Sequence, residues 1–131
     1  MAQHVLIVDD EPEAITLMRL MLKTFNHDSE GVTTGAEAIA HARARQPLLI
    51  LLDLMLPDRT GFDVCAELKA LPETAHIPII MLSARDDREA RERARAAGAD
   101  QFAAKPIRRT QIGEFLEMAL AAAAKRDDRG G

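Results

Sequence analysis

Four short apolar segments, each followed by polar residues, constrain the fold of this chain more than any other feature. The most apolar of them spans residues 48–52, is bounded by Pro47 and Pro57, and leads directly into Asp53. A short, unbroken run of branched apolar residues is typical of a strand that is buried on both faces of a sheet. The other three segments lie at residues 5–8, 77–82 and 101–104, and the last is the weakest.

Helical patterns separate these segments, and a weak strand pattern at residues 29–33 adds a fifth strand. Strands that alternate with helices predict βα units and a parallel sheet. Pro12 marks the first turn of the first helix, and Thr34 with Glu37 forms a capping box at the start of the second. We therefore predict an α/β fold with five helices, at residues 12 to about 26, 34–46, 62–71, 86–97 and 110–125.

Composition restricts the class of protein. The 131 residues are 47% hydrophobic, as in one globular domain, which we expect at residues 1–125 with a polar tail at 126–131. The net charge of −4 does not favour direct binding of nucleic acid. No apolar run reaches the roughly 20 residues of a membrane helix, and no signal-peptide pattern precedes the first strand. Since the single Cys65 agrees with a reducing compartment, we predict a cytoplasmic protein without membrane insertion.

Polar side chains follow four of the predicted strands. Because the carboxyl ends of parallel strands meet at one edge of a sheet, these side chains are expected to share the edge at which open α/β sheets bind ligands. Two carboxylates about 4 Å apart repel by roughly 4 kcal/mol at an effective dielectric of 20. A cluster of carboxylates therefore favours a hard cation with oxygen ligands, and Mg²⁺ fits best. The residues concerned are Asp9, Asp10, Asp53, Ser83 and Lys105.

Each of these residues also has a simpler explanation. The acidic triplet at residues 9–11 can cap the first helix, and a strand-terminal Asp53 can start a turn. A serine such as Ser83 usually caps a helix, and a lysine such as Lys105 is usually solvated. A phenylalanine such as Phe102 usually packs in a core. The position of Asp53 beside the acidic triplet favours the metal site, and such a carboxylate can attack phosphorus to form an acyl phosphate.

Short motifs follow one another in a specific order. They are Val-Leu-Ile-Val-Asp9-Asp10, Leu-Leu-Asp53-Leu-Met-Leu-Pro57, Gly61, Ile-Met-Leu-Ser83-Ala84, Gly98-Ala99-Asp100 and Lys105-Pro106. Each motif is weak alone, but their order and spacing resemble the receiver domains of two-component response regulators, including chemotaxis-regulator-like single domains. The resemblance covers nearly the whole chain. It implies a flavodoxin-like, doubly wound parallel sheet with strand order 2-1-3-4-5.

The resemblance also implies roles for the acidic residues. Asp53 would be the phospho-acceptor and one ligand of Mg²⁺. Asp10 would bind the ion directly and Asp9 partly through water. The backbone carbonyl of Met55 would complete the protein ligands of the metal.

The remaining site residues would act on the phosphoryl group. Ser83 and Lys105 would hold its oxygens and, with Asp53, form the catalytic set. Phe102 occupies the aromatic switch position of the family, where the ring turns inward after the hydroxyl captures the phosphoryl group. The family often has Tyr at this position and Thr at position 83, so here the switch would act without a phenol hydroxyl.

We therefore predict a stand-alone receiver domain that takes its phosphoryl group from a sensor histidine kinase or a histidine phosphotransfer protein. It would catalyse only its own phosphorylation and dephosphorylation, so it is not expected to be an enzyme in the usual sense. The segment after Lys125 is too short for an output domain. The domain would therefore act by binding another protein, by passing the phosphoryl group on, or as a piece of a longer chain. We expect the signal to reach a partner protein through the surface of the fourth helix, fifth strand and fifth helix.

The fourth helix carries a specific expectation. Its inner stripe of Ala90, Ala94 and Ala97 buries little apolar area, which predicts weak attachment to the sheet. Phosphorylation is then expected to shift this helix and recruit the partner through Arg91 and Arg95. A solvated, ion-paired helix without such a role explains the same composition.

Two other functions remain as alternatives. A haloacid-dehalogenase-like aspartyl phosphotransferase or phosphatase would need a second carboxylate two residues after the nucleophile, where this chain has Met55. A degenerate receiver that serves only as a binding scaffold is disfavoured by the acidic pair at residues 9–10 together with Asp53 and Lys105.

Overall fold

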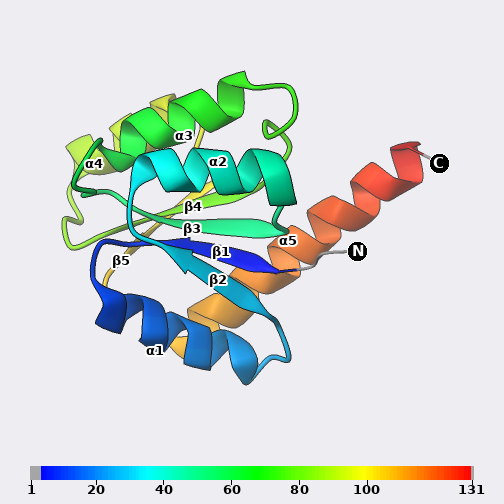
Figure 1. Cartoon of the computed structure of the whole chain (residues 1–131), viewed down its shortest axis with the longest axis horizontal. Helices are drawn as coiled ribbons and strands as arrows, with labels where there is room; N and C mark the ends of the chain where they lie inside the picture. Colours follow the sequence, from blue (N-terminus) through cyan, green and yellow to red (C-terminus); the bar gives the residue numbers. More distant parts are fainter. Residues whose placement is uncertain (1–3, 131) are drawn as a thin grey trace.

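A computed structural model describes residues 4–130 and shows one five-stranded parallel sheet flanked by helices (Figure 1). The strand order is β2-β1-β3-β4-β5, which confirms the predicted topology. The strands are β1 (Val5–Val8), β2 (Ser29–Val32), β3 (Leu49–Asp53), β4 (Ile79–Ser83) and β5 (Gln101–Ala104). The helices are α1 (Pro12–Lys23), α2 (Gly35–Arg45), α3 (Gly61–Ala70), α4 (Arg88–Ala96) and α5 (Arg109–Gly130).

Two helical layers cover the sheet. In Figure 1, α2, α3 and α4 lie on one face, while α1 and α5 lie on the other. Side chains alternate along each strand, so Leu52 points into the cluster beneath α2, α3 and α4, whereas Leu51 points into the cluster beneath α1 and α5. Both are fully buried, which confirms that the apolar run at residues 48–52 forms a strand with two covered faces.

The start of α2 differs in detail from a reciprocal capping box. Thr34 accepts a hydrogen bond from the backbone N–H of Glu37, as predicted. The Glu37 carboxylate, however, accepts from the hydroxyl of Thr34 instead of bonding to its backbone N–H. Two further N–H groups of the first turn, those of Gly35 and Ala36, donate to the carboxylate of Asp58. A loop residue distant in sequence therefore caps α2 together with Thr34.

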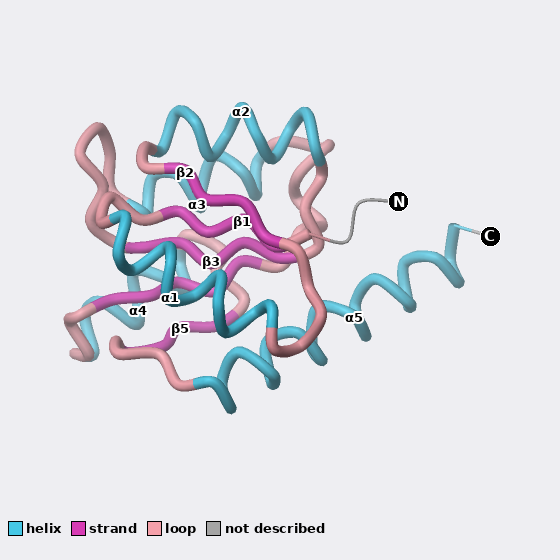
Figure 2. The backbone as a smooth tube through the Cα atoms, turned by 60° about the horizontal axis from the view of Figure 1, so that its bottom comes forward, coloured by secondary structure: helices cyan, strands magenta, loops and turns pink. Residues whose placement is uncertain are grey.

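Two predicted helix ends are wrong. Helix α1 ends at Lys23, and the chain turns at Asn26, whose φ of 61° is not helical. Helix α5 continues to Gly130 instead of ending near Lys125, because the alanines at residues 121–124 favour continued helix. Most of the predicted polar tail is therefore helical, and Figure 2 shows this part of α5 passing beyond the sheet. Gly131 lies outside the described residues.

Among residues 4–130, no helix combines the length and apolar character needed to cross a membrane.

Candidate functional site

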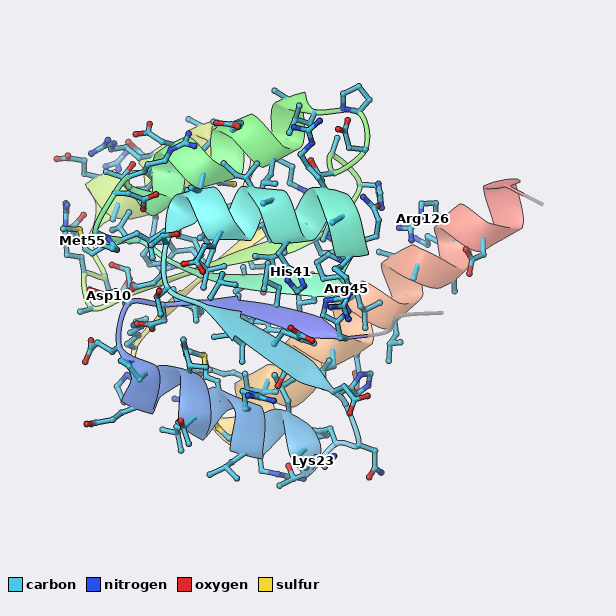
Figure 3. All side chains as sticks on the ribbon, in the orientation of Figure 1. Asp10, Lys23, His41, Arg45, Met55 and Arg126 are labelled. Atoms are coloured by element: carbon cyan, nitrogen blue, oxygen red, sulfur yellow. The ribbon has the colours of Figure 1, made fainter. Side chains whose placement is uncertain are left out.

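The parallel sheet brings the polar residues at the strand ends to one edge. Asp9 follows β1, Asp53 and Ser83 end β3 and β4, and Lys105 follows β5. Since β1, β3, β4 and β5 are consecutive neighbours in the sheet, these four side chains meet at its carboxyl edge. Figure 3 shows Asp10 at the same end of the molecule.

Three carboxylates form a compact cluster at this edge. Asp9, Asp10 and Asp53 each contribute one oxygen, and these oxygens lie within 4.8 Å of one another. Asp9 is fully buried, Asp53 is 6% exposed, and Asp10 faces solvent. Glu11, not an aspartate, is the N-cap residue of α1, and its side chain makes no capping hydrogen bond. The acidic triplet therefore does more than begin a helix, although one oxygen of Asp9 accepts from the N–H of Glu11.

Lys105 reaches into this cluster. Its ammonium group lies 2.8 Å from Asp9 Oδ2 and 3.5 Å from Asp53 Oδ1. Burial lowers the pKa of Lys105, but the hydrogen bond to Asp9 and the charge of Asp53 outweigh burial and raise it. Lys105 therefore carries a positive charge against the cluster. The peptide bond between Lys105 and Pro106 is cis.

One ammonium group does not compensate all of the negative charge. The pKa of Asp53 is raised to about 6. Burial is the largest cause, Lys105 lowers the pKa, and the charge of Asp9 adds to the increase. Asp53 therefore resists ionisation even with Lys105 beside it, and a further positive charge at this edge would favour its ionised form. Oxygen donors without His or Cys suit a hard ion with retained water ligands. The residues present thus fit a divalent cation of the magnesium type.

The backbone of the loop after β3 also contributes to the edge. The backbone of Met55 lies close to the Asp53 carboxylate and lowers its pKa, although less than burial raises it. The Met55 side chain is 67% exposed and lies at the same end as Asp10 in Figure 3. A bridge between Met55 and Thr60 closes this loop, so the backbone on both sides of Asp53 is fixed.

Ser83 lies at the same edge, and Phe102 lies two residues before the end of β5. Ser83 is 2% exposed, and its hydroxyl oxygen accepts a hydrogen bond from the N–H of Arg85 at 2.9 Å. Phe102 is half-buried on β5 and packs against the cluster beneath α2, α3 and α4. Phe102 therefore contributes to the core, as expected for a phenylalanine, and is also partly exposed at the surface.

From the sequence alone, Asp58 has no assigned role, and Gly61 is named only as one motif of the resemblance. Asp58 links the loop after Asp53 to the start of α2, through bonds of 2.8 and 3.0 Å to the N–H groups of Gly35 and Ala36. These bonds lower the pKa of Asp58. Gly61 donates its N–H to the carbonyl of Leu54 at 2.7 Å. The partners of Asp58 are 22 and 23 residues away in the sequence, so no local pattern signals its role.

Fold and edge together define a class of protein: flavodoxin-like domains of the receiver type, with an acidic cluster and a lysine at the carboxyl edge of the sheet. Residues 5–117 match the family model of the response regulator receiver domain. The chain therefore belongs to the response regulator receiver domain family.

Individual relatives agree with this membership. The chain is 36% identical over 107 residues to the phosphate regulon transcriptional regulatory protein PhoB of Rhizobium meliloti, covering 82% of this chain and 47% of that protein. It thus spans about half the length of that relative. Among solved structures, the signal receiver domain of a putative Luxo repressor protein from Vibrio parahaemolyticus has a TM-score of 0.87 and 28% identity, covering 100% of this chain and 99% of that chain.

A second similar structure was solved with a bound metal ion. The receiver domain of the sensor histidine kinase PA1611 from Pseudomonas aeruginosa was solved with a magnesium ion coordinated in its active site cleft. Its TM-score to this chain is 0.84 with 28% identity, covering 92% of this chain and 99% of that chain.

Proposed function

We propose that this chain accepts a phosphoryl group on Asp53 from a phosphohistidine, with Mg²⁺ bound, and transmits the signal to a partner protein. Receiver domains take phosphoryl groups from histidine kinases, and the family membership shown above makes such a kinase or a histidine phosphotransfer protein the donor class. The observation that carries the proposal is the contact of Lys105 with both Asp9 and Asp53. Lys105 thus lies beside two buried carboxylates of the acidic cluster, and Asp53 is the one that ends the central strand β3.

The transfer itself needs little covalent chemistry from the protein. An oxygen of ionised Asp53 attacks the phosphorus while the phosphorus–nitrogen bond to the donor imidazole breaks, and the imidazole leaves with its electron pair and takes up a proton. The Lys105 ammonium group pairs with the charge on the phosphoryl oxygens. Mg²⁺, held by Asp9, Asp10, Asp53 and the Met55 carbonyl, would neutralise further charge on that group.

The chain catalyses only its own modification in this proposal. Ser83 then donates its hydroxyl hydrogen to a phosphoryl oxygen while its oxygen still accepts from Arg85. Phe102 responds to that change, and α4, β5 and α5 present the altered surface to the partner. An aspartyl phosphatase is not favoured, because Met55 offers no second carboxylate.

Phosphate incorporation tests the proposal. Incubation with a small phospho-donor and Mg²⁺ is expected to add acid-labile phosphate, and peptide mapping should place it on Asp53. Asp53→Asn should reduce incorporation to background, because Asp53 is the proposed nucleophile. Asp9, which is also buried beside Lys105, and Asp10 are proposed as ligands of the metal. Incorporation by that variant at the wild-type level would refute the assignment.

Lys105 provides a second prediction that separates metal binding from phosphoryl binding. Lys105→Ala should bind Mg²⁺ as tightly as the wild type or more tightly, because a charge 2.8 Å from Asp9 that competes with the ion is removed. The same variant should lose most of its response to a beryllofluoride phosphate mimic. Calorimetric titration of Mg²⁺ decides the first point, and a large loss of Mg²⁺ affinity would contradict the proposed geometry.

Helix α4 provides a prediction about signal transmission. Its buried residues are Ala90 and Ala94, and Ala97, which was expected in the same stripe, is only partly buried. So small an apolar contact is compatible with low local stability. Hydrogen exchange with and without beryllofluoride should therefore show its largest change, outside the loops of the site, at residues 86–97. If the changes stay beside Asp53, this helix is not the output element.

A further inference from the structure

One charged group of α4, the guanidinium group of Arg91, lies over the ring of Phe102. The guanidinium carbon of Arg91 lies 4.8 Å from the centre of the Phe102 ring, within the range of a cation–π contact. Arg91 Nε also donates a 2.6 Å hydrogen bond to Asp86 Oδ1. Asp86 thus ties the guanidinium group to the loop that follows Ser83. Arg91 and Phe102 both line a groove of about 220 Å³ between α4 and β5.

The register of the sheet puts this contact on the same face as Ser83. Phe102 is paired with Met81, and Ser83 with Ala104. Because side chains alternate between the two faces of a strand, Phe102, Ala104 and Ser83 share one face. Ala104 carries only a methyl group, so it leaves room for a ring that turns toward Ser83. If the Phe102 ring turns in this way, it loses its contact with the guanidinium group of Arg91, because Asp86 holds that group at the surface.

We propose that Arg91, held by Asp86, is a positioning residue that retains Phe102 in the groove between α4 and β5 until Asp53 is modified. This inference rests on the proposed function and adds its regulation. A contact made in only one of two conformations biases the equilibrium between them. Loss of the contact raises the fraction of molecules with the ring turned inward. The apparent affinity for a phosphoryl group or its mimic then rises in proportion to that fraction.

Titration with beryllofluoride in saturating Mg²⁺ tests the inference. Arg91→Ala should increase the apparent affinity about two- to fivefold, the range expected for one partly exposed cation–π contact. Asp86→Asn, which keeps the guanidinium group but weakens its tether, should shift the affinity in the same direction by a smaller factor. Arg88→Ala is the matched control, since Arg88 lies on the same helix and pairs only with Glu92 among the ion pairs of the described chain.

Fluorine NMR observes the ring itself. The chain has four phenylalanines and neither Trp nor Tyr, so labelling with 4-fluorophenylalanine gives four signals, and Phe102→Leu identifies the relevant one. In Arg91→Ala without beryllofluoride, the Phe102 signal should move toward its position in the beryllofluoride complex, while Arg88→Ala leaves it in place.

The two proposals fail separately in this experiment. If wild-type protein does not bind beryllofluoride, or Asp53→Asn binds it equally well, the proposed function is wrong. If the wild type binds normally and Arg91→Ala shows unchanged or weaker affinity, only the positioning role of Arg91 is overturned.

Discussion

Asp53→Asn is expected to stabilise the metal-free protein by about 2 kcal/mol at pH 7.5, although it abolishes the proposed reaction. Burial raises the pKa of Asp53 from its ordinary value of 3.8 to about 6, so the ionised carboxylate is less favourable in the folded state than in the unfolded state. One pKa unit corresponds to about 1.4 kcal/mol, which sets an upper bound near 3 kcal/mol for this shift. Asparagine removes the charge with little change of shape.

The pH dependence fixes the sign. A group whose folded pKa is raised contributes stability that is fully present below its unfolded pKa and is lost as the pH rises through its folded pKa. The advantage of Asp53→Asn should therefore be near zero below about pH 4, grow up to about pH 6 and stay constant above. Urea unfolding in EDTA at several pH values measures it.

Magnesium provides the control for this prediction. If the cluster binds Mg²⁺ as proposed, saturating Mg²⁺ should stabilise the wild type more than the variant. The difference in free energy of unfolding between the two proteins should then shrink or change sign. A variant that is less stable than the wild type at pH 7.5 without metal would show that the Asp53 charge is already compensated in the fold. A stable variant also shows that its lack of phosphate incorporation does not result from unfolding.

Gly61→Ala is expected to lower the free energy of unfolding by about 3 kcal/mol, at the upper end of the cost of overpacking. A Cβ atom at Gly61 would lie 2.4 Å from the carbonyl oxygen of Asp53 and 2.9 Å from the Cα of Leu54. Both are backbone atoms at the end of β3, so they cannot move away without displacing the strand. The variant should also bind Mg²⁺ more weakly, because the displaced segment carries Asp53 and Met55.

Gly31→Ala is a matched control for this effect. A Cβ atom at Gly31 would come equally close, at 2.4 Å, but to Cγ2 of the Ile15 side chain. A side chain can rotate away at a cost of about 1 kcal/mol, and alanine in a strand regains part of that stability relative to glycine. Chemical denaturation of both variants makes the comparison. Equal losses would show that the end of β3 is more compliant than its contacts indicate.

Much of this fold is predictable from sequence because the signals are local. The runs at residues 5–8 and 48–52 are apolar on both faces, and a strand between two helical layers requires that composition. Parallel order then places Asp9, Asp53 and Lys105 at one edge without further information. The predicted sheet is confirmed, and the structure brings these residues together, whereas their roles in phosphoryl transfer remain predictions.

The errors arise where local signals compete with one another or with packing. We predict the end of the first helix near Asn26, although its apolar pattern ends at Leu22, and the structure ends α1 at Lys23 and turns at Asn26. The charged residues after Lys125 suggested a frayed tail, whereas the preceding alanines carry α5 through them. Both differences lie at helix ends, where neighbouring conformations differ little in free energy.

The sequence by itself determined the α/β class, the strand order through its resemblance, and the polar residues that end the strands, because each depends on composition along a short segment. Only the tertiary structure decided that Lys105 bonds Asp9 more closely than Asp53, that Asp58 caps α2, and that Arg91 covers Phe102. These contacts join residues that are far apart in the chain or belong to different elements. Their geometry depends on how the layers pack, and no pattern within one segment contains that information.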